Sequence, residues 1–151
     1  AAIGVVYDPA TREMFAASRG GGATMNGLKL PLRPPAANLK ECVAGVDFKR
    51  IPKKLGDDLA TRPPYYSQRN FGCSTLEWAY IAAGRLDLLL HGGQKLWDYA
   101  AGRLILEEAG GRMCTLKYDD FDADDLWKRS VIAAVDPRLF AAWRDWIRAQ
   151  R

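Results

Sequence analysis

Residues 96–111 read LWDYAAGRLILEEAGG: an acid beside a tryptophan, three small residues, an apolar run and a closing pair of glycines. This order predicts a buried helix with the carboxylate of Asp98 at its N-terminus. Asp is favoured as an N-cap and Gly just beyond a helix end, so the stretch has a purely structural interpretation. A carboxylate in this position can also meet a metal ion or a phosphate group, so a functional interpretation stays open.

The small residues behind Asp98 favour the functional interpretation. Gly102 inside a helix costs about 1 kcal/mol relative to Ala. Its place directly after Ala100 and Ala101 indicates that another group approaches the first turn of this helix closely.

The composition is that of one globular domain of 151 residues, with 48% hydrophobic and 26% charged residues. No apolar run reaches the roughly 18 residues of a membrane span, so we expect no membrane partner. The net charge of +4 is spread along the chain, and nucleic acid is not indicated as a partner. Three widely spaced cysteines and the absence of a signal peptide predict reduced thiols and a cytoplasmic protein.

The first 35 residues predict β-hairpins. Two β-prone runs, 3–7 and 13–17, flank a Pro-containing turn, and Asn26-Gly27 is typical of a two-residue hairpin turn between runs 23–25 and 28–30. The glycine cluster 20–22 lacks the Lys-Ser/Thr and the helix of a phosphate loop, and is interpreted as a flexible turn.

Residues 36–151 predict a layered α/β domain with a mixed, mostly parallel sheet and flanking helices. Ser74 and Glu77 form an S-x-x-E capping box, residues 91–93 suggest a tight turn, and Asp136-Pro137 suggests the start of the last helix. The expected strands are 42–46, 65–71, 86–90, 112–116 and 130–135, and the expected helices begin near 53, 74, 98 and 137.

Four other chemistries are excluded by their strict requirements. The acidic loop 120–125 lacks the glycine and the glutamate of a calcium loop. No cysteine has an arginine six residues on, as a thiol phosphatase requires. His91 is the only histidine and there is no G-x-S-x-G elbow, so a serine hydrolase and a zinc site are poorly supported.

Seven collinear stretches together resemble the inositol monophosphatase family. They are residues 4–9 (GVVYDP), 22–27 (GATMNG), 69–72 (RNFG), 83–87 (AGRLD), 97–102 (WDYAAG), 108–111 (EAGG) and 131–134 (VIAA). The segment between Phe48 and Tyr65 is shorter than is usual in the family. The resemblance implies a Mg²⁺-dependent phosphomonoesterase, in which metal ions bind the phosphate, activate a water and stabilise the leaving alkoxide.

The resemblance also implies site residues. Asp98 matches the aspartate that ligates a metal ion and faces the substrate hydroxyl beside the phosphate. Gly72, Cys73 and Ser74 match a loop that touches the sugar, and Lys49 lies in a loop lining the same pocket. His91 stands where inositol-type members commonly have a Glu that binds ring hydroxyls, which puts inositol itself in question as the substrate.

The D-P-x-D-G-T motif and the glutamate that complete the family's metal site are not found in this chain. Because Mg²⁺ needs several oxygen ligands, Asp98 alone cannot hold it. We therefore expect the C-terminal portion of a phosphatase, inactive by itself and acting on a small phosphate ester in its complete form. The alternative is a short non-catalytic relative, a binding or assembly module. In either case the exposed edge of hairpin 3–17 suggests a homodimer or other self-association.

Overall fold

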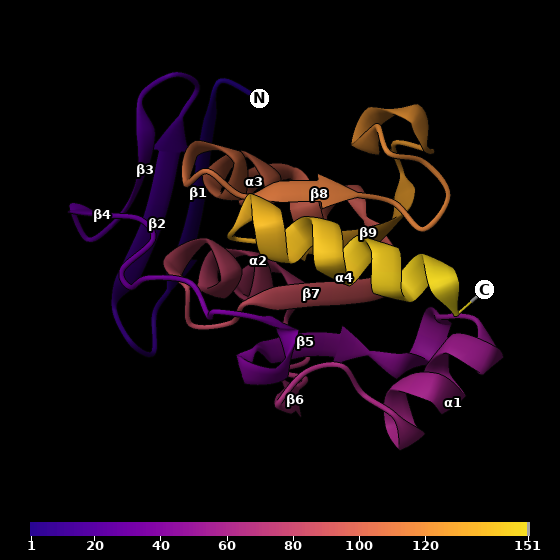
Figure 1. The fold of residues 1–151 in the computed structure, drawn as a ribbon. Helices are drawn as coiled ribbons and strands as arrows, with labels where there is room; N and C mark the ends of the chain where they lie inside the picture. Colours follow the sequence, from indigo (N-terminus) through magenta and orange to yellow (C-terminus); the bar gives the residue numbers. More distant parts are fainter. Residues whose placement is uncertain (151) are drawn as a thin grey trace.

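The computed structural model describes residues 1–150, which form two β-sheets with helices between and beside them (Figure 1). The first sheet is antiparallel, in the order β1 (Ile3–Asp8), β2 (Glu13–Ser18), β3 (Gly22–Met25) and β4 (Leu28–Lys29). Side chains alternate along β1, so Val6 is buried while Ile3 is exposed. The two predicted hairpins are therefore parts of one four-stranded sheet.

The second sheet has the order β6 (Ser67–Arg69), β5 (Val43–Asp47), β7 (Leu88–Lys95), β9 (Lys128–Ala134), β8 (Arg112–Cys114). β6, β5 and β7 are parallel neighbours, whereas β9 runs antiparallel to both β7 and β8. The predicted mixed α/β sheet is confirmed, with its parallel pairs confined to one side.

The helices are α1 (Lys53–Thr61), α2 (Ser74–Ala83), α3 (Leu96–Glu108) and α4 (Pro137–Ala149), with short 3-10 turns η1 (Leu39–Glu41), η2 (Phe48–Arg50) and η3 (Phe121–Ala123). None of the helices within residues 1–150 combines the length and the apolar character needed to cross a membrane. α4 begins as predicted, with the Asp136 side chain accepting from the backbone N–H groups of Arg138 and Leu139.

α2 and α3 lie between the two sheets, and α4 covers the opposite face of the second sheet (Figure 1). Trp78 of α2 and Leu104 of α3 share a core with Phe15 of the first sheet and Leu89 of the second. Trp143 of α4 packs with a separate set that includes Leu88 and Leu90. The division into units 1–35 and 36–151 stays a prediction, and one core joins the first sheet to the helices.

Three local predictions are wrong. Cys73, not Ser74, is the N-cap of α2, and the Glu77 carboxylate accepts from the backbone of Phe71 instead of closing a capping box. Residues 91–93 are not a tight turn, because β7 continues through them with a register irregularity between His91 and Gln94. Asp98 is the third helical residue of α3 and not its N-cap, and its Oδ2 accepts from the backbone N–H of Lys95 at 2.8 Å.

Candidate functional site

The carboxyl ends of three neighbouring parallel strands meet at one edge of the second sheet. β5 leads into η2, which carries Lys49; β6 leads through residues 70–73 into α2; and β7 leads into α3. Ligands of α/β proteins bind outside the carboxyl ends of such strands. The edge thus collects the segments that carry all the predicted site residues, namely Lys49, Gly72, Cys73, Ser74, His91 and Asp98.

α2 and α3 cross closely, and from this crossing we infer that Ser74 and Asp98 lie on the same side of the molecule. A Cβ atom added to Gly102 would lie 2.3 Å from the Cβ of Trp78. Trp78 follows Ser74 by four residues, as Gly102 follows Asp98, and both helices start from the same edge of the sheet. At a rise of 1.5 Å per residue, Ser74 and Asp98 each lie about 6 Å along their helix from the crossing.

The crossing also explains the small residues behind Asp98. Trp78 occupies the space beside Gly102, and a Cβ on Gly4 of β1 would lie 2.9 Å from the backbone oxygen of Ala101. The groups that approach the first turns of α3 are therefore α2 and β1. The functional interpretation of these small residues is not needed, because packing within the chain accounts for them.

His91 is 4% exposed and both of its ring nitrogens have partners within the chain. Nδ1 accepts from the backbone N–H of Gly93 at 3.0 Å, and Nε2 lies 3.3 Å from Oδ2 of Asp47. An accepting Nδ1 assigns the proton to Nε2, which makes the ring neutral. Burial lowers the pKa of His91, and the positive charge of Arg50 lowers it further. The negative charges of Asp47 and Asp98 raise it, but burial is the larger effect, so the lowered pKa agrees with a neutral ring.

Asp47 was not identified from the sequence. It ends β5, pairs in register with His91 across the parallel strands, and caps η2 by accepting the backbone N–H of Lys49 at 2.8 Å through Oδ1. Its side chain is 15% exposed. The available signal was an acid directly after the buried run 42–46, but its partner lies 44 residues away in the sequence.

Glu77 shapes the loop that precedes α2. Its Oε1 accepts from the backbone N–H of Phe71 at 3.0 Å, and Oδ1 of Asn70 accepts from Gly72, whose φ is +70°. Burial raises the pKa of Glu77; the bond from Phe71 opposes this and the charge of Asp47 adds to it. The first turn of α2 receives no side-chain cap at Cys73, so its N–H groups suit an anion at this edge.

Two exposed cations, Lys49 and Arg50, lie on η2 beside the same edge. A Cβ on Gly92 would lie 1.8 Å from the backbone oxygen of Arg50, so only glycine allows η2 to rest on β7 here. Gly92 thus allows the cationic turn to lie directly against β7.

The carboxylates do not form a complete magnesium site. Asp98 accepts from Lys95 through one oxygen, and among residues 1–150 no group of three His, Cys, Asp or Glu side chains is arranged to hold a metal ion. Mg²⁺ requires octahedral oxygen coordination. The described residues therefore do not fit Mg²⁺ on their own, and Asp98 can contribute at most one carboxylate to such a site.

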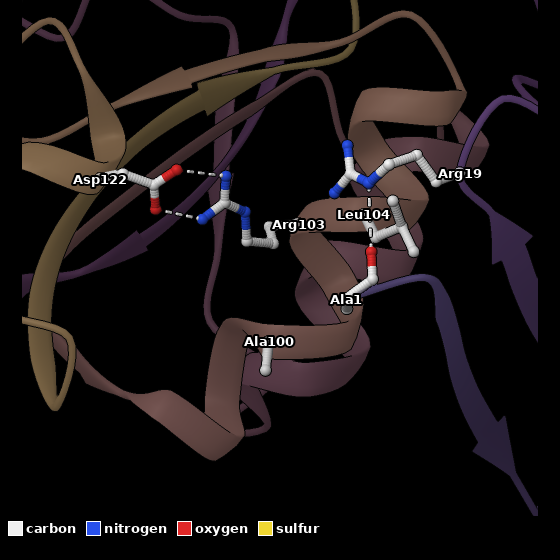
Figure 2. A pocket seen from close by; sticks show the side chains of 6 residues that line it. All are labelled: Ala1, Arg19, Ala100, Arg103, Leu104 and Asp122. Atoms are coloured by element: carbon white, nitrogen blue, oxygen red, sulfur yellow. Dashed lines mark hydrogen bonds and ion pairs between the residues drawn. The ribbon is translucent and has the colours of Figure 1, made fainter.

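A separate cavity lies along α3 and is drawn in Figure 2. It is lined by Ala1, Arg19, Ala100, Arg103, Leu104 and Asp122. Arg103 donates to both carboxylate oxygens of Asp122, and Nε of Arg19 donates to the backbone oxygen of Ala1 (Figure 2). Arg103 also donates to Glu107. Because these cations are already paired, the cavity is a weaker phosphate site than the edge that carries Lys49.

Comparison with known proteins gives a consistent result. The model of the inositol monophosphatase family matches residues 1–147. The Nus factor SuhB of Haemophilus influenzae is 37% identical over 139 residues, which cover 87% of this chain and 50% of that protein. SuhB of Escherichia coli K12 is 38% identical over 120 residues, covering 72% of this chain and 42% of that protein. The chain thus spans about half the length of the curated relatives it matches.

Solved structures share the fold. SuhB from Bartonella henselae superposes with a TM-score of 0.78 at 29% identity, covering 96% of this chain and 58% of that one. Inositol monophosphatase II from Staphylococcus aureus superposes with a TM-score of 0.81 at 21% identity, covering 97% of this chain and 56% of that one. At the lower identity the likeness shows the fold alone.

Proposed function

The chain belongs to the inositol monophosphatase family, and from that premise we propose that it is the C-terminal, substrate-recognising part of a phosphomonoesterase. The complete enzyme hydrolyses phosphate esters of inositol or a sugar with Mg²⁺, and the present chain is inactive by itself. The coverage of about half of each relative supports this division. A solved structure of a dual specific IMPase/NADP phosphatase bound with D-inositol-1-phosphate shares the fold with a TM-score of 0.79 at 24% identity. The proposed substrate class rests on the family and not on this likeness.

One observation carries the proposal: three parallel strands deliver segments far apart in sequence to a single edge. Lys49 and the uncapped first turn of α2 offer positive charge and N–H groups to a phosphate. Asp98, on the first turn of α3, offers an anionic oxygen to a metal ion or a hydroxyl. The remaining magnesium ligands would come from outside residues 1–150.

The deciding experiment measures phosphate release from D-inositol-1-phosphate with Mg²⁺ by a longer protein that contains this chain. We expect Asp98→Asn to lower kcat by about 100-fold or more, because it removes an anionic oxygen at the reacting phosphate. Asp119→Asn, on a side chain 72% exposed, is the matched control and should leave the rate unchanged. Full activity of Asp98→Asn would remove Asp98 from the site, and rapid turnover by the 151-residue chain would contradict its inactivity.

The second candidate is a non-catalytic assembly module, which also provides for self-association. Within residues 1–150, β1 pairs with β2 alone, and its outward side chains Ile3, Val5 and Tyr7 are 71%, 49% and 52% exposed. An open apolar edge of this kind can pair with a second copy. The curated relatives bear the name of a factor and not of an enzyme. For an assembly module, sedimentation should show a dimer. A monomer at all concentrations, together with phosphatase activity in the longer protein, would exclude this candidate.

We also propose a cytoplasmic location and neither a membrane nor a nucleic-acid partner. The support is the spread of the +4 charge along the chain, together with Cys42 and Cys73, which are free thiols in the structure. Fractionation of the producing cells, with detection of the protein in the soluble or the membrane fraction, tests the location.

A further inference from the structure

The contacts of the half-buried Asp47 and the buried His91 differ from those that the sequence predicts for substrate recognition. That prediction assigns His91 to the hydroxyl groups of the substrate. In the structure its Nδ1 accepts from the backbone N–H of Gly93 and its Nε2 lies 3.3 Å from Asp47, and its side chain is 6% exposed. A neutral imidazole has one acceptor and one donor, so His91 has no hydrogen-bonding position left for a substrate.

Asp47, in contrast, has capacity left. Each of its carboxylate oxygens has one partner, the Lys49 N–H for Oδ1 and the His91 ring for Oδ2. A carboxylate accepts about four hydrogen bonds, so about two more can be formed. Its side chain is 15% exposed against 6% for that of His91, and it ends β5 at the edge that carries Lys49.

We propose that the Asp47 carboxylate binds two neighbouring hydroxyl groups of the substrate, and that His91 is the positioning residue that holds Asp47. The preferred ester is then the phosphate of a polyol with adjacent hydroxyls. This inference rests on the proposed phosphatase function. It places the recognition carboxylate on β5, next to the strand where the family commonly carries it.

The first test compares two substrates in the longer, active protein with Mg²⁺ present. D-inositol-1-phosphate carries adjacent hydroxyls, whereas phenyl phosphate has none. We expect Asp47→Asn to lower kcat/KM for D-inositol-1-phosphate by about 10- to 100-fold, the usual effect of losing hydrogen bonds to a charged group. The value for phenyl phosphate should stay within about twofold. Equal losses on both substrates, or no loss on either, would overturn the proposal.

Asp57→Asn is the matched control, because it makes the same chemical change on α1 at a side chain 63% exposed. This variant should leave kcat/KM for both substrates unchanged. A selective loss in this variant would show that the effect does not come from the edge of the sheet.

The positioning role of His91 has its own readout. The amide of Gln can donate to Asp47 and accept from Gly93, whereas Phe keeps the bulk of the ring and can do neither. His91→Gln should retain the preference for D-inositol-1-phosphate. His91→Phe should lose this preference because its KM for D-inositol-1-phosphate rises, while its kcat for phenyl phosphate stays unchanged. If His91→Phe retains the preference, His91 does not position Asp47. Should His91→Phe not fold, Asp47→Asn still decides the main claim.

A binding measurement separates this inference from the proposed function. D-inositol-1-phosphate is titrated without Mg²⁺ while the backbone amide signals of Lys49 and Gly93 are followed by NMR. Shifts in the wild type and Asp57→Asn, but not in Asp47→Asn, support the role of Asp47 even if the protein proves to have no phosphatase activity. If the wild type shows no shift and no preference between the substrates, the inference is wrong, whatever the rate of phosphate release.

Discussion

Gly102→Ala tests whether the close crossing of α2 and α3 determines the site. The new Cβ would lie 2.3 Å from the Cβ and 2.6 Å from the Cγ of Trp78. No rotation of the Trp78 side chain relieves the first contact, because a Cβ is fixed by the backbone. Trp78 is fully buried, and its indole N–H donates to Gln94 at 2.7 Å, so the two helices must separate.

The size of the effect follows from two opposing contributions. Replacing Gly by Ala in a helix interior stabilises by about 1 kcal/mol. Forcing a methyl group into a packed core costs about 1 to 3 kcal/mol, and a contact between two backbone-fixed atoms belongs at the upper end. The net loss in the free energy of unfolding is about 2 kcal/mol, which lowers Tm by about 4 to 8 °C for a chain of this size.

The assay is urea unfolding followed by tryptophan fluorescence, with Gly56→Ala as the matched control. Gly56 is inside α1, and the nearest atom to its added Cβ is 3.8 Å away, an ordinary contact. That variant should gain about 0.5 to 1 kcal/mol. If Gly102→Ala is as stable as the wild type, or both variants shift in the same direction, the crossing is looser than described and the inferred proximity of Ser74 and Asp98 loses its basis.

Two further predictions concern titration and reactivity. Burial lowers the pKa of His91 in the folded state, so the unfolded chain binds its proton first as the pH falls below about 6.5, and stability should decline in that window. In urea titrations between pH 8 and 5, the free energy of unfolding of His91→Gln should not show the part of the decline that His91 causes. Glu77 contributes with the opposite sign because its pKa is raised, and this contribution is the same in the wild type and the variant. Iodoacetamide should label the exposed Cys73 in the folded protein and the buried Cys42, whose pKa burial raises to about 12, only after unfolding; equal rates would contradict the burial.

Features encoded in short stretches could be predicted from the sequence. The Asn26-Gly27 turn needs two positive φ angles, and the structure has +47° and +81° there. The N-cap at Asp136 and the family resemblance across residues 1–147 also depend on neighbours in sequence. The fold class could therefore be predicted without coordinates.

What the sequence could not supply were pairings between distant segments. The S-x-x-E motif at Ser74 correctly predicts that a helix begins there, but not its capping. Cys73 is the N-cap, and Glu77 accepts from the backbone N–H of Phe71 instead. The Asp47–His91 pair depends on the register of two strands 44 residues apart. The roles of the predicted residues in binding a substrate or a metal ion stay predictions.

α3 has a mechanical consequence that follows from its two ends. At its start Asp98 belongs to the candidate site, and at its end the carboxylate of Glu108 accepts from the backbone of Gly20 at 2.9 Å and of Gly22 at 3.0 Å. The ten residue steps from Asp98 to Glu108 span about 15 Å along the helix. The helix is therefore a strut that ties the turn between β2 and β3 to the site. A rotation of the first sheet relative to the second would move Asp98 as well. A partner that binds the glycine turn would therefore change the position of the distant carboxylate.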